Sequence, residues 1–139
     1  MKTEKQKLIK ENDKIWSLLV RIRDNFKCQI CGKYSKHTEA MHIFGCGWKA
    51  TRWDTRNGLT GCYYCHRFKM HGGRLSEEEK KQLLIKIISQ DLYDELYRKS
   101  REPVKFNFEF VSLWNHLLRT EFLNMTGMTY EEFLKEQRR

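Results

Sequence analysis

The sequence predicts an α+β protein in which a small cysteine-rich segment is flanked by α-helices. Apolar residues recur at helical spacing before residue 27 and after residue 75. The segment 28–74 between them is poor in aliphatic residues and rich in Cys, His, Gly and Arg, so it cannot build an ordinary hydrophobic core. A chain of 139 residues with 40% hydrophobic content is long enough for one compact domain, and we expect a single domain over residues 1–139.

Hydrophobic periodicity and capping residues predict the helices. Ser76 and Glu79 have the spacing of a capping box, and Thr129 with Glu132 repeats it near the end of the chain. The stretch VKFNFEF alternates like a strand, but the apolar residues that follow it keep a helical period and favour a helix. The ranges expected to be helical are 4–26, 77–89, 90–100 and 108–125, with a last short helix after Thr129.

Four of the five cysteines form two C-x-x-C pairs, CQIC at Cys28 and Cys31 and CYYC at Cys62 and Cys65. Each pair presents two thiolates from one tight turn, and two such pairs complete a tetrahedral zinc site with no open position. The sequence therefore predicts one structural Zn²⁺. Cys46 has no partner at this spacing and is expected to be an ordinary thiol on a loop.

The formal net charge of +9 is unevenly distributed. Residues 1–74 have sixteen Lys and Arg against six Asp and Glu, whereas residues 75–139 have eleven against twelve. A local basic excess is typical of a surface that binds a polyanion, most often nucleic acid, although a solubilising surface also explains it. The chain has no apolar run of about 20 residues and no apolar signal-peptide core, so we expect an intracellular protein.

Three stretches carry a resemblance to a known family: IWSLLVRIRDNFKCQICGK, HIFGCGWKATRWDTRNGL and CYYCHRF. Together they resemble the HNH endonuclease superfamily in its four-cysteine zinc branch, and are similar to phage recombination nucleases of the lambda Rap (NinG) and T4 endonuclease VII type. The similarity covers residues 15–71. It implies a ββα-metal finger and a divalent-metal-dependent DNA endonuclease of phage or mobile-element recombination, replication or packaging, in the cytoplasm of a host bacterium.

The resemblance also assigns roles to three residues. His42 matches the general base that takes a proton from the attacking water, which then displaces the 3′ oxygen; a neutral imidazole suits this task. Asn57 matches the brace that ties the loop between two strands, although Asn-Gly is also an ordinary turn signal. His66 matches a ligand of the catalytic Mg²⁺ or Mn²⁺, which contacts the scissile phosphate.

The position before the base departs from the family pattern. It is commonly Asp or His and supplies a second ligand, but here it is Met41, whose thioether is unsuited to a hard cation. We expect the carboxylate of Asp54 to serve instead, with His71 and Glu39 as alternatives. His71 lies five residues after His66, which on a continuous α-helix points away from it. If none of them serves, the finger is a non-catalytic zinc module that binds DNA or a protein.

Five basic residues are expected to surround the site and to contact DNA phosphates: Lys49, Arg52, Arg56, Arg67 and Lys69. Their binding to duplex or branched DNA would depend on salt and show little base preference.

Trp48 and Trp53 are candidates for stacking on unpaired bases or for packing over the thin finger. Residues 75–139 have no motif that we can place, and are a candidate surface for a homodimer or for a recombination or replication protein.

Overall fold

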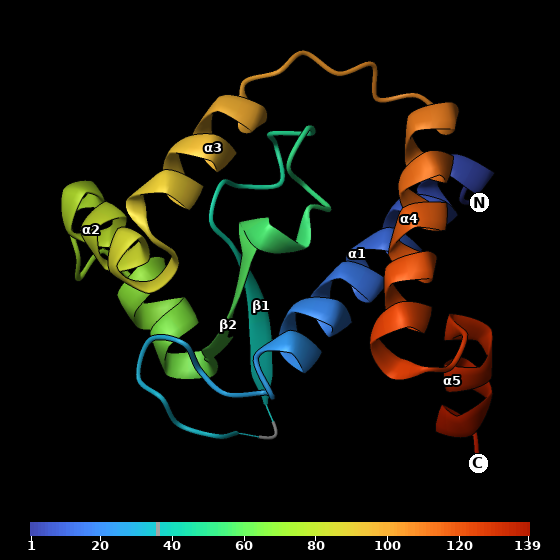
Figure 1. The fold of residues 1–139 in the computed structure, drawn as a ribbon, viewed down its shortest axis with the longest axis horizontal. Coiled ribbons are helices and arrows are strands. Elements are labelled where there is room, and N and C mark those ends of the chain that lie inside the picture. Colours follow the sequence, from blue (N-terminus) through green and yellow to red (C-terminus); the bar gives the residue numbers. More distant parts are fainter. Residues whose placement is uncertain (36) are drawn as a thin grey trace. The chain divides into compact units, whose positions relative to one another are not determined.

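The computed structural model describes residues 1–35 and 37–139 and has an α+β fold, as predicted (Figure 1). The expected helices form, and their ends agree with the predicted ranges to within three residues. In chain order the elements are α1 (Glu4–Arg23), β1 (Thr38–His42), the 3₁₀ turn η1 (Thr55–Asn57), β2 (Gly58–Cys62), the π-helix η2 (Cys65–Met70), α2 (Glu77–Ile88), α3 (Gln90–Ser100), α4 (Phe108–Thr126) and α5 (Tyr130–Gln137).

Both predicted capping sites start helices. The Ser76 hydroxyl accepts a hydrogen bond from the Glu79 N–H at 3.1 Å, and the Glu79 carboxylate accepts one from the Ser76 N–H at 3.1 Å. This capping box begins α2. The hydroxyl of Thr129 accepts a hydrogen bond from the Glu132 N–H at 3.1 Å and begins α5. Local sequence chemistry therefore decides where these helices start.

Contacts within the chain divide it into two compact units. We call residues 20–104 the finger unit, and residues 1–19 together with 105–139 the helical unit. Helix α1 is continuous, with its last turn in the finger unit. In the part of the chain that the structure describes, no helix is long and apolar enough to cross a membrane.

In the helical unit, a buried asparagine connects α1 to α4. The Asn12 side-chain amide donates a hydrogen bond to the Val111 carbonyl at 3.0 Å, and the Asn115 amide donates one to the Asn12 side-chain oxygen at 2.8 Å. Nearer the carboxyl end, the rings of Phe122 and Tyr130 meet edge to face with 5.5 Å between centroids, which joins α4 to α5. These contacts hold the three helices of this unit together.

In the finger unit, β1 and β2 form an antiparallel hairpin that ends with His42 opposite Gly58. Thr60 in the middle of β2 is fully buried and anchors the hairpin to the end of α1. Its N–H donates to the Asp24 carboxylate at 3.0 Å, and its hydroxyl donates to the Val20 carbonyl at 3.3 Å. The last turn of α1 thereby fixes the position of the strands.

A small hydrophobic core joins the hairpin to α2 and α3. Met41, Leu59 and Leu84 are its buried members. A Cβ atom on Gly61 would lie 2.6 Å from the Met41 sulfur, so the absence of a side chain at Gly61 makes room for the methionine. The thioether of Met41 is therefore part of the core. The partly buried residues packed against it are Ile30, Ile43, Met70, Ile87, Ile88 and Tyr93.

Candidate functional site

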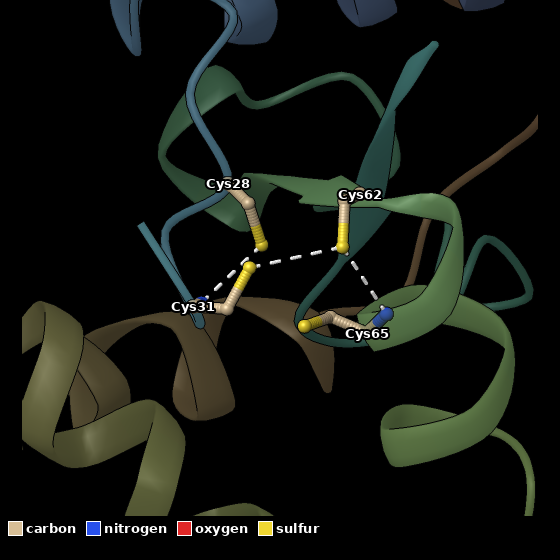
Figure 2. Close-up of side chains that lie close together, drawn as sticks. All are labelled: Cys28, Cys31, Cys62 and Cys65. Atoms are coloured by element: carbon tan, nitrogen blue, oxygen red, sulfur yellow. Dashed lines mark hydrogen bonds between the residues drawn. The ribbon is translucent and has the colours of Figure 1, made fainter. Parts of the chain in front are cut away.

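Four cysteine sulfurs lie together at the base of the hairpin, as Figure 2 shows for Cys28, Cys31, Cys62 and Cys65. All four lie within 4.8 Å of one another. The sulfurs of Cys31 and Cys62 are 3.8 Å apart. Two sulfurs on a tetrahedral Zn²⁺ with bonds of about 2.3 Å are separated by roughly 3.8 Å. The cluster can therefore hold a metal ion, and four sulfur ligands in this arrangement favour zinc.

The backbone shapes each cysteine pair into a tight turn. The Cys31 N–H donates to the Cys28 sulfur at 3.4 Å, and the Cys65 N–H donates to the Cys62 sulfur at 3.4 Å. Gly32 follows the first pair with φ of 79°, a conformation that glycine adopts without strain. Cys46 is exposed on the loop between the strands and is not one of the four.

The four thiols of the cluster do not ionise with equal ease. Burial opposes ionisation of Cys28, but the backbone N–H groups around its sulfur outweigh burial and lower its pKa to about 7. Burial and the neighbouring thiols raise the pKa of Cys65. Four adjacent thiolates repel one another strongly, whereas a bound Zn²⁺ deprotonates the thiols that coordinate it.

His42 is the last residue of β1, and a backbone carbonyl fixes the orientation of its ring. Its Nε2 lies 2.9 Å from the carbonyl oxygen of Arg52. Because a carbonyl can only accept, we assign the hydrogen to Nε2, and the lone pair of the neutral ring then lies on Nδ1. The loop between the strands therefore selects the tautomer of His42.

Asn57 is fully buried and ties this loop together from within. Its side-chain nitrogen donates to the carbonyls of Phe44 at 2.9 Å and Thr51 at 3.0 Å. Its side-chain oxygen accepts from the Phe44 N–H at 2.8 Å. Since Thr51 directly precedes Arg52, the amide of Asn57 holds the segment whose carbonyl orients His42.

The π-helix η2 brings His66 and His71 together, with 4.9 Å between ring centroids. The expectation that His71 points away from His66 is wrong, because a π-helix closes its hydrogen bonds between residues five apart rather than four. The Glu39 carboxylate of β1 lies 3.2 Å from the Nδ1 of His66. One carboxylate and two imidazoles therefore form a chain of contacts between β1 and the end of η2.

Neighbouring charges set the protonation of this group. Hydrogen bonds from Arg67, at 3.1 Å, and from His66 hold the pKa of Glu39 below its usual value, so the carboxylate stays ionised. Burial lowers the pKa of His71, and the neighbouring His66 and Lys80 side chains lower it further. His71 is therefore neutral at about pH 7, which is the form that binds metal.

Asp54, the carboxylate that we expected to bind the catalytic cation, is instead held by basic side chains. It is buried, and its oxygens lie 2.7 Å from the Lys99 ammonium and 2.9 Å from the Arg56 guanidinium. It also accepts a hydrogen bond from the Arg56 N–H at 3.0 Å and so begins η1. The carboxylate that reaches His66 is Glu39, which the sequence offered only as an alternative.

A cleft of about 380 Å³ opens beside these residues in the finger unit. His42 and His71 both line it, and α2 contributes Lys80 and Lys81. The Lys80 ammonium also binds the Glu77 carboxylate at 3.1 Å. The region after residue 75, to which no motif assigned a role, therefore supplies a basic wall of the cleft that contains His42.

The predicted DNA contacts differ in how they are held. Arg56 binds two carboxylates, Asp54 and Glu95, each at 2.9 Å. Arg67 binds Glu39 at 3.1 Å. These two guanidinium groups would have to exchange protein partners for phosphates. The other three predicted contacts are Lys49 and Arg52 in the loop between the strands, and Lys69 in η2.

The two tryptophans of the loop have different settings. Trp53 is buried, with 1% of its surface exposed, so it packs in the interior and offers no face to a base. Trp48 is 43% exposed, and the guanidinium carbon of Arg101 lies 3.6 Å from its ring centre. The same guanidinium lies 4.4 Å from the ring of Tyr97. No local pattern in the sequence indicated this stack, because it joins the loop to the end of α3.

The described residues thus combine an α+β fold with a four-cysteine cluster that can hold a metal. A histidine of fixed tautomer, His42, lies at the end of β1, and a carboxylate–imidazole group connects β1 with η2. A comparison of the chain with models of known protein families, with curated proteins and with solved structures finds no match.

Proposed function

We propose that this protein is a divalent-metal-dependent endonuclease that hydrolyses phosphodiester bonds of DNA, in the manner of the HNH nucleases that its sequence resembles. The observation that carries the proposal is the 2.9 Å contact between His42 Nε2 and the Arg52 carbonyl. It makes Nδ1 the proton acceptor of a ring whose supporting loop is locked by Asn57. A general base in this role needs a fixed orientation and an unprotonated nitrogen.

The order β1, loop, β2, η2 supports a ββα-metal finger with the zinc cluster at its base. Glu39 and His66, with His71 beside them, would hold the catalytic cation. A cation bound there would stabilise negative charge on the phosphate and on the leaving oxygen. Because two of the three side chains offer imidazole nitrogen, this set suits Mn²⁺ better than Mg²⁺, which prefers oxygen ligands and water.

The proposed reaction is hydrolysis at phosphorus. His42 accepts a proton from water, the water oxygen bonds to phosphorus, and the bond from phosphorus to the 3′ oxygen breaks as that oxygen takes a proton from solvent water. The products are a 5′ phosphate and a 3′ hydroxyl. Lys80 and Lys81, in the same cleft as His42, support a polyanionic substrate because their ammonium groups attract phosphates on either side of the reacting bond.

A non-catalytic zinc module that binds DNA is the second candidate, and Glu39 provides the observation that favours it. The guanidinium of Arg67 already neutralises this carboxylate at 3.1 Å. Met41, at the position where the family places a ligand, is part of the core. Under this second hypothesis, Arg67 takes the place of the catalytic cation and the finger binds DNA without cutting it.

A plasmid-nicking assay separates the two candidates. Supercoiled plasmid is incubated with the wild-type protein in Mn²⁺, in Mg²⁺ or without added divalent metal, and in parallel with His42→Ala and His116→Ala. His116 is exposed on α4 and serves as the control. The endonuclease hypothesis predicts that His42→Ala lowers the nicking rate by roughly 10² to 10⁴-fold, since this is the usual contribution of a general base, while zinc content stays unchanged. Equal nicking by wild type and His42→Ala would exclude His42 as the base, and a wild type that binds DNA but never nicks it supports the module.

A further inference from the structure

The helical unit contains a basic hollow that has no part in the zinc cluster or in the group around His42. It has a volume of about 490 Å³ and is lined mainly by α1, α5 and the residues next to them. We call it the lysine groove, after the side chains that dominate its lining. Its basic members are Lys2, Lys7, Lys10, Lys14 and Arg138.

Acidic side chains leave most of this positive charge unbalanced. Glu11 also lines the groove, but its carboxylate is bound by Arg119 at 2.7 Å and by the Asn115 amide at 2.6 Å. Lys7 lies 3.4 Å from Glu4, and both side chains are exposed, so this pair contributes little. Four basic residues of the groove form no ion pair with any residue in the ranges 1–35 and 37–139: Lys2, Lys10, Lys14 and Arg138.

These cations are close enough to repel one another. The proximity of Lys10, and to a smaller extent of Lys14, lowers the pKa of Lys2. Lys10 and Lys14 are also an i, i+4 pair of like charges on α1, an arrangement that destabilises a helix. The fold holds these charges together without offsetting them, and a bound polyanion would remove the repulsion.

We propose that the lysine groove binds the phosphate backbone of a nucleic-acid strand, as a contact surface additional to that of the finger unit. Lys7, Lys10 and Lys14 follow α1 for about 10 Å, the rise of seven helical residues. Duplex DNA presents a negative charge for about every 1.7 Å of its axis, so several phosphates fit this length. Binding at the groove requires no cleavage, and the inference therefore does not depend on the endonuclease proposal.

The lining favours phosphates over an acidic protein. Lysine ammonium groups are point charges that bind phosphate from many directions and read no base. Protein interfaces usually gain affinity from aromatic anchors in apolar pockets. The aromatic residue of the groove, Tyr130, has only 5% of its surface exposed and offers little apolar area to a partner.

The test measures DNA affinity as a function of salt, using the full chain in a His42→Ala background without added Mg²⁺ or Mn²⁺. A groove pair, Lys10→Gln with Lys14→Gln, is compared with a control pair, Lys105→Gln with Lys135→Gln. All four lysines are exposed and belong to the helical unit, and both pairs remove the same charge. We expect the groove pair to reduce the slope of log affinity against log salt by about 1.8, since each phosphate contact contributes about 0.9.

The control pair should leave this slope nearly unchanged, and circular dichroism should show that both double variants are folded. Equal slopes for the two pairs, changed or unchanged, would overturn the proposal, because the groove would then be no more than general surface charge. Competition by polyglutamate is the second readout. The substitutions of the groove pair should weaken DNA binding more than polyglutamate binding. If they weaken both by the same factor relative to the wild type, the groove is a surface for acidic proteins and the proposal is wrong. A nicking assay plays no part in this test, so its outcome is separate from that of the endonuclease hypothesis.

Discussion

The carboxylate of Glu39 and the Nδ1 of His66 lie 3.2 Å apart, which joins β1 to η2 in the finger unit. Glu39 lies two positions before Met41, and side chains two apart on a strand share a face. The methionine on that face packs into the core, and the glutamate reaches the helix. Under the endonuclease proposal, Glu39 would supply the acidic ligand that Met41 lacks, and the methionine would be free to pack in the core.

If Glu39 binds the catalytic cation, Glu39→Gln should weaken Mn²⁺ binding by about 10 to 100-fold, because loss of a carboxylate partner at a metal site has effects of this size. The measurement is the Mn²⁺ titration of the protein by electron paramagnetic resonance, together with the Mn²⁺ dependence of nicking. Asp54→Asn is the matched control, and should leave Mn²⁺ binding unchanged. The opposite pattern, with Asp54→Asn as the weaker binder, would restore Asp54 as the ligand.

Asp54→Asn should instead lower the free energy of unfolding, by about 3 kcal/mol, because it leaves Lys99 and Arg56 without a partly buried partner. Burial alone would raise the pKa of Asp54, but hydrogen bonds from Arg56 and Lys99 outweigh it and hold the pKa below its usual value. A lowered folded-state pKa gives stability that is present above the unfolded-state pKa of about 3.9 and is lost as the pH falls further.

Urea unfolding of wild type and Asp54→Asn between pH 7 and pH 3 checks both statements. The difference between the two unfolding free energies should be constant from pH 7 to about pH 5 and should narrow only below about pH 4. If the difference already narrows between pH 7 and pH 5, the pH dependence comes from the titration of a group other than Asp54.

For the cysteine cluster we expect about one tightly bound Zn²⁺ per chain. Cys28→Ser or Cys65→Ser should remove the metal and unfold the finger unit, since structural zinc sites contribute on the order of 10 kcal/mol. Cys46→Ser is the control, and because Cys46 is exposed its unfolding free energy should change by less than about 0.5 kcal/mol. Metal analysis and thermal melting are the measurements. A zinc-free protein that keeps its fold would rule out a structural metal.

Asn57→Asp tests whether the amide locks the loop that orients His42. An ionised carboxylate cannot donate to the carbonyls of Phe44 and Thr51, so we expect a loss of about 3 kcal/mol in unfolding free energy. Asn107→Asp is the control, because Asn107 caps α4 by accepting a hydrogen bond from Phe110, which Asp does equally well. Urea unfolding should show a large loss for the first variant and almost none for the second. Similar losses for both would argue against the lock.

The features that the sequence predicted are those that short-range chemistry decides. Helix limits follow from apolar spacing and from caps such as Ser76 with Glu79, all within a few residues of one another. The cysteine cluster follows from two pairs whose internal spacing is already that of a metal site. In each case the local stretch contains the information, and the tertiary fold only has to bring two such stretches together.

The features that the sequence did not predict depend on partners far along the chain. The Asp54 carboxylate forms an ion pair with Lys99, a residue of α3 that belongs to no recognisable motif. Lys80 of α2 contributes to the basic wall of the cleft beside His42, and the sequence around it matches no motif that we recognise. Charge and residue type alone could not show that Asp54 is held by Lys99, whereas Glu39 reaches His66.

The π-helix η2 also changes the sequence spacing at which two histidine side chains meet. Two histidines that meet on one turn of an α-helix are separated by three residues, but His66 and His71 are separated by four. The wider turn of a π-helix accommodates one residue more than a turn of an α-helix. The backbone is tight just after this turn, because a Cβ atom on Gly72 would lie 2.5 Å from the Phe68 carbonyl oxygen. Removing a single residue between the histidines should restore an ordinary α-helix with the two rings still in contact.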